Sequence, residues 1–466
     1  MDDLSFRAQF HRALDPTAPA APWLAAHVRE GLARRRRSVR PGLRGSGRLR
    51  QPPGLLPAVA VLLAIAIIIA IVLSSRMLPF NRSIPVFPPQ HGLAGPAGCP
   101  GWSIGSPGGP GGGGGDRMAS VSTGWVSGGL RTTDGGAGWT RVLPDAMLSD
   151  APAGTDHRAY PPGYTDYFLD ANHAWLAYAL PSATSCFDHV TVFATADGGE
   201  TWKRSHPLEA AIQADTGLQL VLDFVDPQHG WLLVLANGRL APDWFVYATA
   251  NGGVDWRPVS QIPLMSSFCS ATFVSLQVGF LGGCSNASGP SADLTVTRDG
   301  GRTWQDVRLP APGEGSLSVG QPHFFDANHG VVHVTVSTTE GNVITPSDLL
   351  DATDDGGQTW HALPPVEVTG YSQAFAFADP THFYDLVGAP KGGSDSVYRS
   401  LDGGMTWSPV NESTDAYFMG YSQLLFVDSN HGFIDEPGQQ FGQAPHTFLA
   451  TSDGGRTWKD MHPRLT

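Results

Sequence analysis

The chain has 466 residues, which exceeds one ordinary single-core domain unless that domain is a repeat array or a propeller. Its 57 glycines and 38 prolines indicate many turns, while 41% hydrophobic residues exclude wholesale disorder. The net charge of -13 divides unevenly along the chain. Residues 1–54 hold eleven Arg and four acidic residues, a net charge of +7. The remaining residues hold 18 of the 29 basic and 38 of the 42 acidic side chains, a net charge of -20.

Residues 55–75, LLPAVAVLLAIAIIIAIVLSS, carry no charge and are long enough to cross a bilayer as a helix. The run begins too far from the N-terminus for a cleaved signal peptide. Arginines crowd its N-terminal side, so the positive-inside rule places residues 1–54 in the cytoplasm. We therefore expect a single-pass protein of the cell membrane with its acidic bulk outside. The partly helical basic segment is expected to contact anionic lipid rather than nucleic acid, because it contains no recognisable nucleic-acid-binding module.

Residues 76–116 read as a Pro/Gly-rich linker. Its stretch GSPGGPGGGGGD lacks the Gly-Lys-Ser/Thr of a phosphate loop, and we expect no cofactor. The scarcity of lysine beside abundant arginine, with many Ala, Gly and Pro, is typical of a bacterial protein from a GC-rich genome.

All four cysteines follow the apolar run, which fits an oxidising compartment. Four cysteines permit three pairings. If a hairpin turn is centred at residues 276 and 277, Cys269 and Cys284 are cross-strand partners. A bridge there would leave Cys99 to pair with Cys186.

An octapeptide of the form Thr-x-Asp-Gly-Gly-x-Thr-Trp recurs seven times, at 132–139, 195–202, 249–256, 297–304, 353–360, 400–407 and 451–458. Successive copies are 47 to 63 residues apart, which is the size of a propeller blade. A second signature precedes the copies, as in FLDANHAW, FVDPQHGW and FVDSNHGF. It reads as a strand, a polar turn and a second strand opened by an aromatic residue. Four strands and two hairpins in each unit predict an all-β fold, a seven-bladed β-propeller of four-stranded blades over residues 117–466.

The octapeptide resembles the Asp-box, or BNR, repeat family. The resemblance implies a hairpin turn in which the carboxylate accepts backbone N–H bonds, glycine takes a positive φ, and the tryptophan packs between adjacent sheets. The box positions are Asp134, Asp197, Asn251, Asp299, Asp355, Asp402 and Asp453, and the tryptophans are Trp139, Trp202, Trp256, Trp304, Trp360, Trp407 and Trp458. Turn chemistry alone leads to the same structural role, since Asn251 suits a tight turn but could not act as an acid or base.

Five histidines follow an aspartate at an offset of three, in the pairs Asp170–His173, Asp226–His229, Asp326–His329, Asp379–His382 and Asp428–His431. An Asp-x-x-His cluster could ligate zinc. Each pair occupies the same turn of a different blade, however, so the pairs are spread around a ring. We therefore interpret them as stabilised turns and expect no metal site.

Loops of variable length all fall on one face of the predicted ring, which we call the loop face: 142–164, 180–189, 236–243, 283–293, 338–350 and 434–446. Variable loops on a rigid scaffold are where binding usually occurs. The longest insertion offers Arg158, Tyr160 and Tyr164 as contacts for a protein or a glycan, although a plain solvated loop explains it equally.

The tetrapeptide GYSQ appears twice, each time opening the first strand of a blade. First strands line the central channel. Tyr371, Gln373, Tyr421 and Gln423 are therefore candidates for its mouth, and inherited packing is the alternative.

Two families with Asp-box propellers suggest different functions. Sialidases are six-bladed and need an Arg-Ile-Pro motif, an arginine triad, a Tyr/Glu nucleophile pair and an Asp acid. This chain has no Arg-Ile-Pro, so the sialidase-like glycoside hydrolase is the alternative, and we expect no enzyme. Photosystem II assembly-factor propellers are seven-bladed, and their resemblance covers about residues 118–460. It implies a membrane-anchored binding scaffold, for example an assembly factor for a membrane complex. Such a scaffold would bind a protein or a glycan on the loop face.

Overall fold

The computed structural model describes residues 116–150, 161, 163–180, 189–209, 218–237, 242–263, 270–282, 293–310, 316–340, 343–388, 395–410, 423–436, 444–445 and 447–466. The chain divides into two compact units, Met1–Leu14 with His91–Thr466 and Asp15–Gln90, of which the second lies wholly outside this described part. The predicted membrane span and all four cysteines also lie outside it. Among the residues that are described, no helix has the length and apolar character to cross a bilayer.

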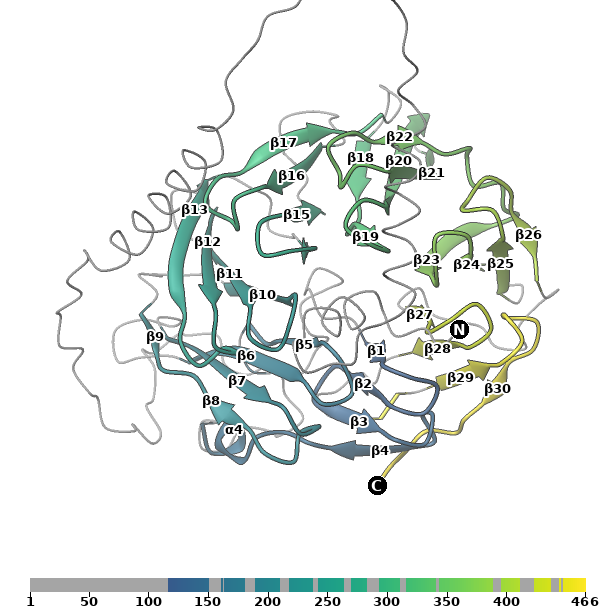
Figure 1. The fold of residues 1–466 in the computed structure, drawn as a ribbon. Coiled ribbons are helices and arrows are strands. Elements are labelled where there is room, and N and C mark those ends of the chain that lie inside the picture. Colours follow the sequence, from purple (N-terminus) through teal and green to yellow (C-terminus); the bar gives the residue numbers. More distant parts are fainter. Residues whose placement is uncertain are drawn as a thin grey trace, which may run out of the picture. The chain divides into compact units, whose positions relative to one another are not determined.

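Seven sheets follow one another along the chain and form the blades of a ring (Figure 1). Blade 1 holds β1 (Arg117–Met118), β2 (Gly124–Val126), β3 (Leu130–Thr132) and β4 (Gly138–Arg141). Blade 2 holds β5 (Thr165–Phe168), β6 (Ala174–Leu180), β7 (His189–Thr195), β8 (Lys203–Arg204) and β9 (Leu208–Glu209). Blade 3 holds β10 (Leu218–Phe224), β11 (Gly230–Asn237), β12 (Pro242–Thr249) and β13 (Arg257–Pro263). Blade 4 holds β14 (Ser270–Phe273), β15 (Gly279–Gly282), β16 (Asp293–Thr297) and β17 (Gln305–Arg308).

The remaining blades continue this order. Blade 5 holds β18 (Ser316–Val319), β19 (His323–Phe324), β20 (Gly330–Glu340), β21 (Val343–Thr353) and β22 (His361–Ala362). Blade 6 holds β23 (Tyr371–Phe377), β24 (Phe383–Gly388), β25 (Ser396–Ser400) and β26 (Ser408–Pro409). Blade 7 holds β27 (Gln423–Phe426), β28 (Gly432–Glu436), β29 (Thr447–Thr451) and β30 (Lys459–Asp460). The predicted seven-bladed propeller of four-stranded blades is confirmed.

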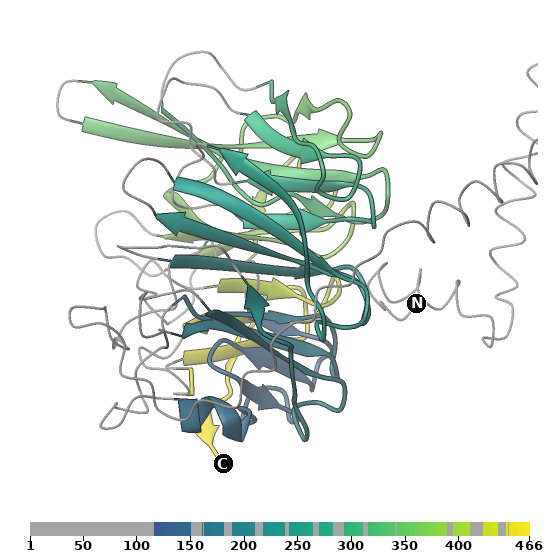
Figure 2. The ribbon, with the colours of Figure 1, turned by 90° about the vertical axis from the view of Figure 1, so that its left-hand side faces the viewer.

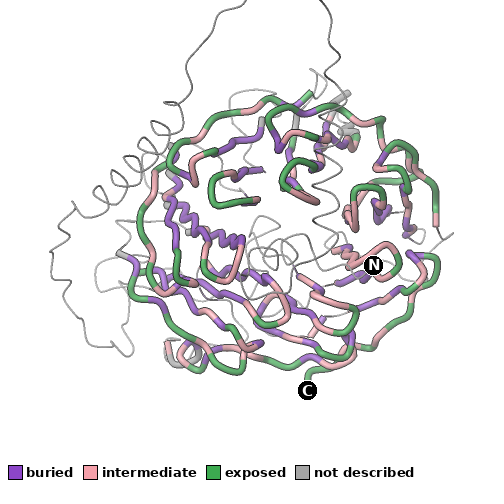
Figure 3. Tube along the Cα trace, in the orientation of Figure 1, coloured by how far each residue is buried: buried purple, intermediate pink, exposed green. Residues whose placement is uncertain are grey.

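The two middle strands of a blade are buried on both faces, because each sheet packs between two neighbours. In β11, for example, Leu232, Leu233, Val234 and Leu235 are all fully buried. Such near-continuous apolar runs are expected of sheets covered on both sides. Exposed residues concentrate in the turns and in the short outermost strands (Figure 3).

Two segments expected as loops are regular structure. Residues 338–350 belong largely to β20 and β21, which pair from Gly330–Thr353 out to Glu340–Val343. This hairpin projects from the loop face (Figure 2). Pro346 is tolerated in β21 because β22 pairs only with its far end, which leaves the projecting part as a sheet edge. The second segment is α4 (Asp145–Asp150), whose Met147 is buried against Tyr178 and Phe193.

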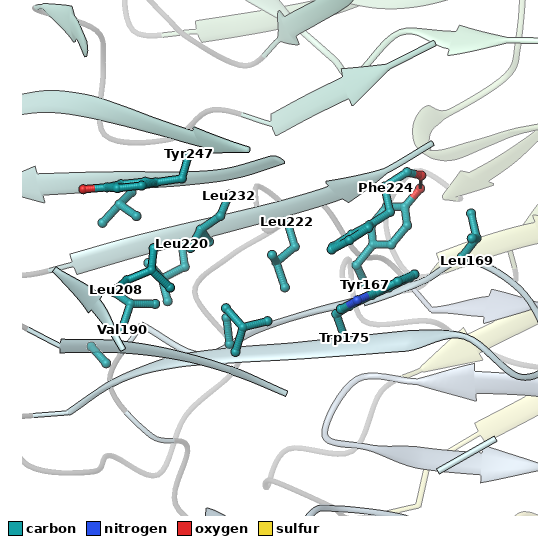
Figure 4. Packing of buried hydrophobic residues seen from close by; sticks show 14 residues of the cluster. Tyr167, Leu169, Trp175, Val190, Leu208, Leu220, Leu222, Phe224, Leu232 and Tyr247 are labelled. Atoms are coloured by element: carbon teal, nitrogen blue, oxygen red, sulfur yellow. Dashed lines mark hydrogen bonds between the residues drawn. The ribbon is translucent and has the colours of Figure 1, made fainter. Parts of the chain in front are cut away.

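Aromatic side chains join neighbouring blades by one repeated contact. Trp175 of blade 2 stacks on Phe224 of blade 3 with ring centroids 3.6 Å apart (Figure 4). Phe224 also meets Trp256 edge-on at 5.9 Å. The same arrangement joins Trp231, Phe273 and Trp304, then Phe280, Phe324 and Trp360, then Tyr384, Phe426 and Trp458. Large rings in offset or edge contact contribute beyond their buried area. The aromatic residues of both sequence signatures therefore meet between blades.

The glycine of the second signature is required by this contact. Gly230 is the cross-strand partner of Phe224, and a Cβ on Gly230 would collide with the Phe224 ring. The ring can lie over the strand only where the partner has no side chain.

The ring is closed by a short C-terminal strand, β31 (Arg464–Leu465), which adds to the outside of blade 1 in parallel with β4. The Arg464 N–H donates to the Ala137 carbonyl oxygen at 3.0 Å, and the Thr466 N–H donates to that of Trp139 at 2.8 Å. The Thr140 and Thr466 hydroxyls are 2.9 Å apart. This closure was not predicted from the sequence, because residues 464–466 carry no strand pattern.

Arg464→Pro should loosen the closure, because proline lacks the N–H that reaches Ala137. We expect a loss of roughly 1–3 kcal/mol in the free energy of unfolding, measured by urea denaturation. Arg464→Ala is the matched control: it keeps the N–H and removes only an exposed side chain, so its effect should stay within about 0.5 kcal/mol. Equal stability of the two variants would contradict the closure.

Candidate functional site

The seven Asp boxes lie at the turns between the third and fourth strands, on the face opposite the loop face. In blade 7, Asp453 Oδ1 accepts the Thr457 N–H and the Thr451 hydroxyl, both at 2.9 Å. The Trp458 indole N–H donates to the Gly455 carbonyl oxygen at 3.1 Å. Both glycines of every box have φ between 71° and 97°. Because each carboxylate is bonded within its own turn, the boxes are structural elements.

Blade 3 shows how one box tolerates asparagine. Asn251 Oδ1 accepts the Asp255 N–H at 2.9 Å, as the aspartates do elsewhere. Its Nδ2 donates to Asp255 Oδ2 at 2.8 Å, at the position where other boxes have a threonine hydroxyl as donor. In this box Asn251 donates through its amide and Asp255 accepts through its carboxylate, the reverse of the usual Asp–Thr pair. The turn therefore persists without its usual carboxylate.

The Asp-x-x-His pairs are also separate turns. In the first of them, Asp170 Oδ1 accepts the N–H groups of Asn172 and His173 at 2.8 Å, and His173 Nδ1 lies 2.9 Å from Asp170 Oδ2. The pairs of the other four blades repeat this contact. No group of three potential metal ligands occurs among the described residues.

The predicted loop-face contacts are only partly described. Arg158, Tyr160 and Tyr421 lie outside the described residues. Tyr164 differs from the expectation of an exposed contact, because it is 7% exposed and its hydroxyl donates to Asp166 Oδ2 at 2.9 Å.

The two glutamines of the GYSQ repeats are both described. Tyr371 and Gln373 lie on β23, where the Tyr371 side chain is 46% exposed. Gln423 lies on β27 as the register partner of Asp435. First strands do carry these residues, as expected from the repeat.

Sequence reasoning missed three buried aspartates at the loop-face ends of the inner strands. Asp116 precedes β1, Asp166 is the second residue of β5, and Asp435 is the penultimate residue of β28. They come from blades 1, 2 and 7, which are neighbours around the ring, and none is more than 4% exposed. We call Asp116, Asp166 and Asp435 the carboxyl cluster.

Adjacent backbone N–H groups hold two of these carboxyls side by side. Ser127 N–H donates to Asp116 Oδ1 at 2.6 Å, and Gly128 N–H donates to Asp166 Oδ2 at 3.1 Å. Burial, together with repulsion from Asp116, raises the pKa of Asp166 to about 7. Asp166 is therefore protonated in mildly acidic solution and half-ionised near neutrality.

Asp435 of blade 7 also interacts with Asp116. Burial raises its pKa well above the usual range, and the charge and hydrogen bond of Asp116 add to the increase. Neither Asp435 oxygen, nor Asp116 Oδ2, has a hydrogen-bond donor among the described residues. Repulsion between neighbouring carboxyls adds to the effect of burial, so Asp435 resists ionisation.

A second polar group lies between blades 5 and 6, and we call it the seam group: His333, Thr335, Asp348, Ser372 and Asp385. His333 Nε2 and Asp348 Oδ1 are 2.7 Å apart, and the Ser372 hydroxyl donates to Asp385 Oδ2 at 2.6 Å. Burial raises the pKa of Asp385 well above its usual range, against the opposing hydrogen bond from Ser372. The side chains of His333 and Asp348 are 28% and 14% exposed, whereas Asp385 is fully buried.

The sequence does carry a weak signal for both groups. Aspartates interrupt apolar strands in TDYF, FIDE and FYDLV, where a polar residue on a doubly covered strand must be buried. Buried carboxyls are rare without partners. That rarity marks the positions as candidates.

No protein-family model matches the chain, and no curated protein matches it. Among solved structures it is similar to the GH74 xyloglucanase from Xanthomonas campestris, at 17% identity and a TM-score of 0.46, over 78% of this chain and 55% of that one. It is similar to a Hadza microbial sialidase at 17% identity and a TM-score of 0.32, over 61% of this chain and 55% of that one. A PL25 ulvan lyase matches at 11% identity and a TM-score of 0.41, over 79% and 96%. The chain thus spans about half the length of the xyloglucanase and the sialidase.

At these identities and TM-scores the likeness carries no activity to this chain. It does correct one expectation. We expected no enzyme because the sialidase motifs are missing, yet these structures, with an α-L-arabinofuranosidase from Fusarium graminearum and an arabinanase from Penicillium chrysogenum, are all carbohydrate-active enzymes. That expectation is wrong. Membership of the Asp-box family, and the likeness to photosystem II assembly factors, are not confirmed by any of these comparisons.

The raised pKa of Asp166 predicts a stability that falls as pH rises. The folded chain keeps this proton up to about pH 7, whereas the unfolded chain loses it near 3.8. Between these values only the folded state holds the proton, so the free energy of unfolding decreases with pH and levels off above 7. Asp166→Asn is neutral at every pH and should remove a decrease of roughly 3 kcal/mol between pH 5 and pH 8.

Thermal unfolding of wild type and variant at pH 5, 6.5 and 8 tests this. Asp299→Asn is the control, because hydrogen bonds to Thr303 lower the pKa of Asp299 and its contribution is lost only at more acidic pH. A wild-type Tm that is unchanged or higher at pH 8 would exclude a protonated Asp166.

Proposed function

We propose that the propeller is a glycoside hydrolase for neutral glycans, with the carboxyl cluster as its catalytic site. The observation that supports this is the cluster itself: at the loop face Asp116 interacts with both Asp166 and Asp435, and burial raises the pKa of Asp166 to about 7. Hydrolysis of a glycosidic bond uses one protonated and one ionised carboxyl.

The three carboxyls have different roles in the proposed reaction. Asp166 gives its proton to the glycosidic oxygen as the bond from that oxygen to the anomeric carbon breaks. Asp116 takes a proton from the water that attacks the anomeric carbon, and this water becomes the new hydroxyl of the sugar. Asp435, protonated, donates a hydrogen bond to the free Oδ2 of Asp116 and so orients it. Proton exchange with solvent then returns Asp166 and Asp116 to their starting states.

The charge around the cluster favours neutral sugars. The charged side chains that act on Asp435 are Asp116 and Glu436, and the one that acts on Asp166 is Asp116. An anionic sugar such as a sialoside would be repelled by these acids. The proposal therefore keeps a glycoside hydrolase but not a sialidase.

Burial sets a requirement on substrate access. Asp116, Asp166 and Asp435 are 4%, 3% and 0% exposed, so a glycan can reach them only if neighbouring side chains move. Tyr164 is in direct contact with Asp166, because its hydroxyl donates to Asp166 Oδ2 at 2.9 Å. Enzymes commonly close over substrate and so exclude water from the reacting groups.

We also propose that residues 55–75 anchor the enzyme in the cell membrane with the propeller outside and residues 1–54 in the cytoplasm. The uncharged run and the arginines before it support this orientation. Protease added to intact cells should remove the propeller and leave the N-terminal segment protected. Protection of the propeller would exclude this topology.

Asp116→Asn and Asp166→Asn should each lower kcat/KM by about 10²–10⁴-fold, because each removes one half of the acid–base pair. The full-length protein would be assayed against aryl glycosides, xyloglucan, arabinan and sialosides, with reducing ends as the readout. Wild-type kcat/KM should decrease above about pH 7 as Asp166 ionises.

Asp402→Asn serves as the control, because asparagine already occupies the equivalent box position 251 and the box lies on the opposite face. It should retain wild-type kcat/KM. If the cluster variants alter only Tm, or if only sialosides are cleaved, the proposed function is wrong.

A further inference from the structure

The first strand of blade 6 contains a β-bulge next to the seam group. Ser372 pairs with Val387 and Ala374 pairs with Leu386, which leaves Gln373 as the extra residue of β23. A bulge redirects one side chain out of the regular alternation, and such bulges are frequent beside functional sites.

The bulged residue has an unsatisfied amide. Gln373 Nε2 and Oε1 are both buried, and neither has a hydrogen-bond partner among the described residues. Leaving a buried polar group unpaired is unfavourable, so an unpaired donor and acceptor on one side chain call for a bound molecule that offers both. A pair of neighbouring sugar hydroxyls does so.

An exposed aromatic ring lies beside this amide. A Cβ on Gly388 would collide with both the Tyr371 ring and the Gln373 amide, so the two side chains cover the same backbone position. Tyr371 is 46% exposed, one of few large apolar side chains that are exposed in the described part of the chain. An exposed ring offers an apolar surface for the CH groups of a pyranose, while its hydroxyl remains available to water.

The inner strands connect this position to the carboxyl cluster. β23 contacts β27, and β27 contacts β1, so the three first strands are consecutive around the channel. On β27, Gln423 is the register partner of Asp435. Amide and carboxyl groups thus continue along the loop-face ends of blades 6, 7 and 1.

We propose that Tyr371 and Gln373 form a saccharide-binding subsite, where the sugar face stacks on the Tyr371 ring and two adjacent hydroxyls pair with the Gln373 amide. The proposal rests on the proposed function in placing the cleaved bond at the carboxyl cluster: the subsite binds a sugar unit remote from that bond. The preferred substrate is therefore a neutral oligosaccharide long enough to extend from blade 1 to blade 6. A protein partner is less suited, because an apolar side chain on Tyr371 would leave the Gln373 amide unpaired.

The test measures binding separately from turnover. Full-length Asp116→Asn protein, in which the proposed hydrolysis is slowed, is titrated by calorimetry with xylo-, arabino- and cello-oligosaccharides of two to six units. Tyr371→Ala and Gln373→Ala, each added to this background, should weaken binding of the longest oligosaccharide that binds by about tenfold, and binding of the disaccharide by less than twofold. Tyr371→Phe keeps the ring and should bind like the parent.

Leu401→Ala is the matched control, because Leu401 is 57% exposed in the same blade but lies in the Asp box on the opposite face. Thermal unfolding of every variant checks that the fold is retained, and Tyr371→Ala, at an exposed position, keeps the test valid if Gln373→Ala is unstable. Affinities for long glycans that are the same in Tyr371→Ala and Leu401→Ala would overturn the subsite, even with hydrolysis intact. Length-dependent binding without any wild-type turnover would instead support the subsite and refute the hydrolase. No binding of any glycan would refute both.

Discussion

The stacking of aromatic rings between blades is the interaction on which the rest of the structure depends. An aromatic residue that opens the second strand of one blade lies flat on the phenylalanine that ends the first strand of the next, and the box tryptophan closes the contact edge-on, as in Trp175, Phe224 and Trp256. Each contact needs residues from both sequence signatures and from two blades. The repeat therefore specifies both the blade and the contact between neighbouring blades. Function is free to vary where this contact is absent.

Carboxyl groups behave oppositely on the two faces. In the boxes they accept several hydrogen bonds at the surface, and those bonds lower the pKa of Asp197 and Asp355 to about 2. Between the blades at the loop face they are buried with few donors, so their pKa is raised, as in Asp166. The box carboxylates lose their stabilising effect in acid, when they become protonated. The buried loop-face carboxyls destabilise the fold above neutrality, when they become ionised. A protein with both kinds should be most stable at mildly acidic pH.

The fold could be predicted from the sequence because its signal is repeated, whereas the candidate site could not because its residues are not. Seven boxes in register outweigh any single substitution, such as Asn251. Asp166, Asp385 and Asp435 each occur once, on different strands, so no alignment of blades highlights them. Likewise, the bulge at Gln373 depends on one extra residue in β23, and the β20–β21 hairpin extends its pairing as far as Glu340 and Val343. The candidate-site residues therefore lie where the sequence departs from the repeat, and a prediction based on the repeat does not reveal them.

The same reasoning explains the mistaken expectation that the protein is not an enzyme. The missing Arg-Ile-Pro motif and arginine triad exclude recognition of an anionic sugar by the sialidase route, but they say nothing about glycosidic bonds between neutral sugars. Those bonds require only that one carboxyl hold a proton while a second does not. Burial between blades, with the charge of Asp116, raises the pKa of both Asp166 and Asp435, and the proposed reaction uses Asp166 as its protonated carboxyl. The proposed hydrolysis therefore depends on buried carboxyls between neighbouring blades and not on the arginines of the sialidase route.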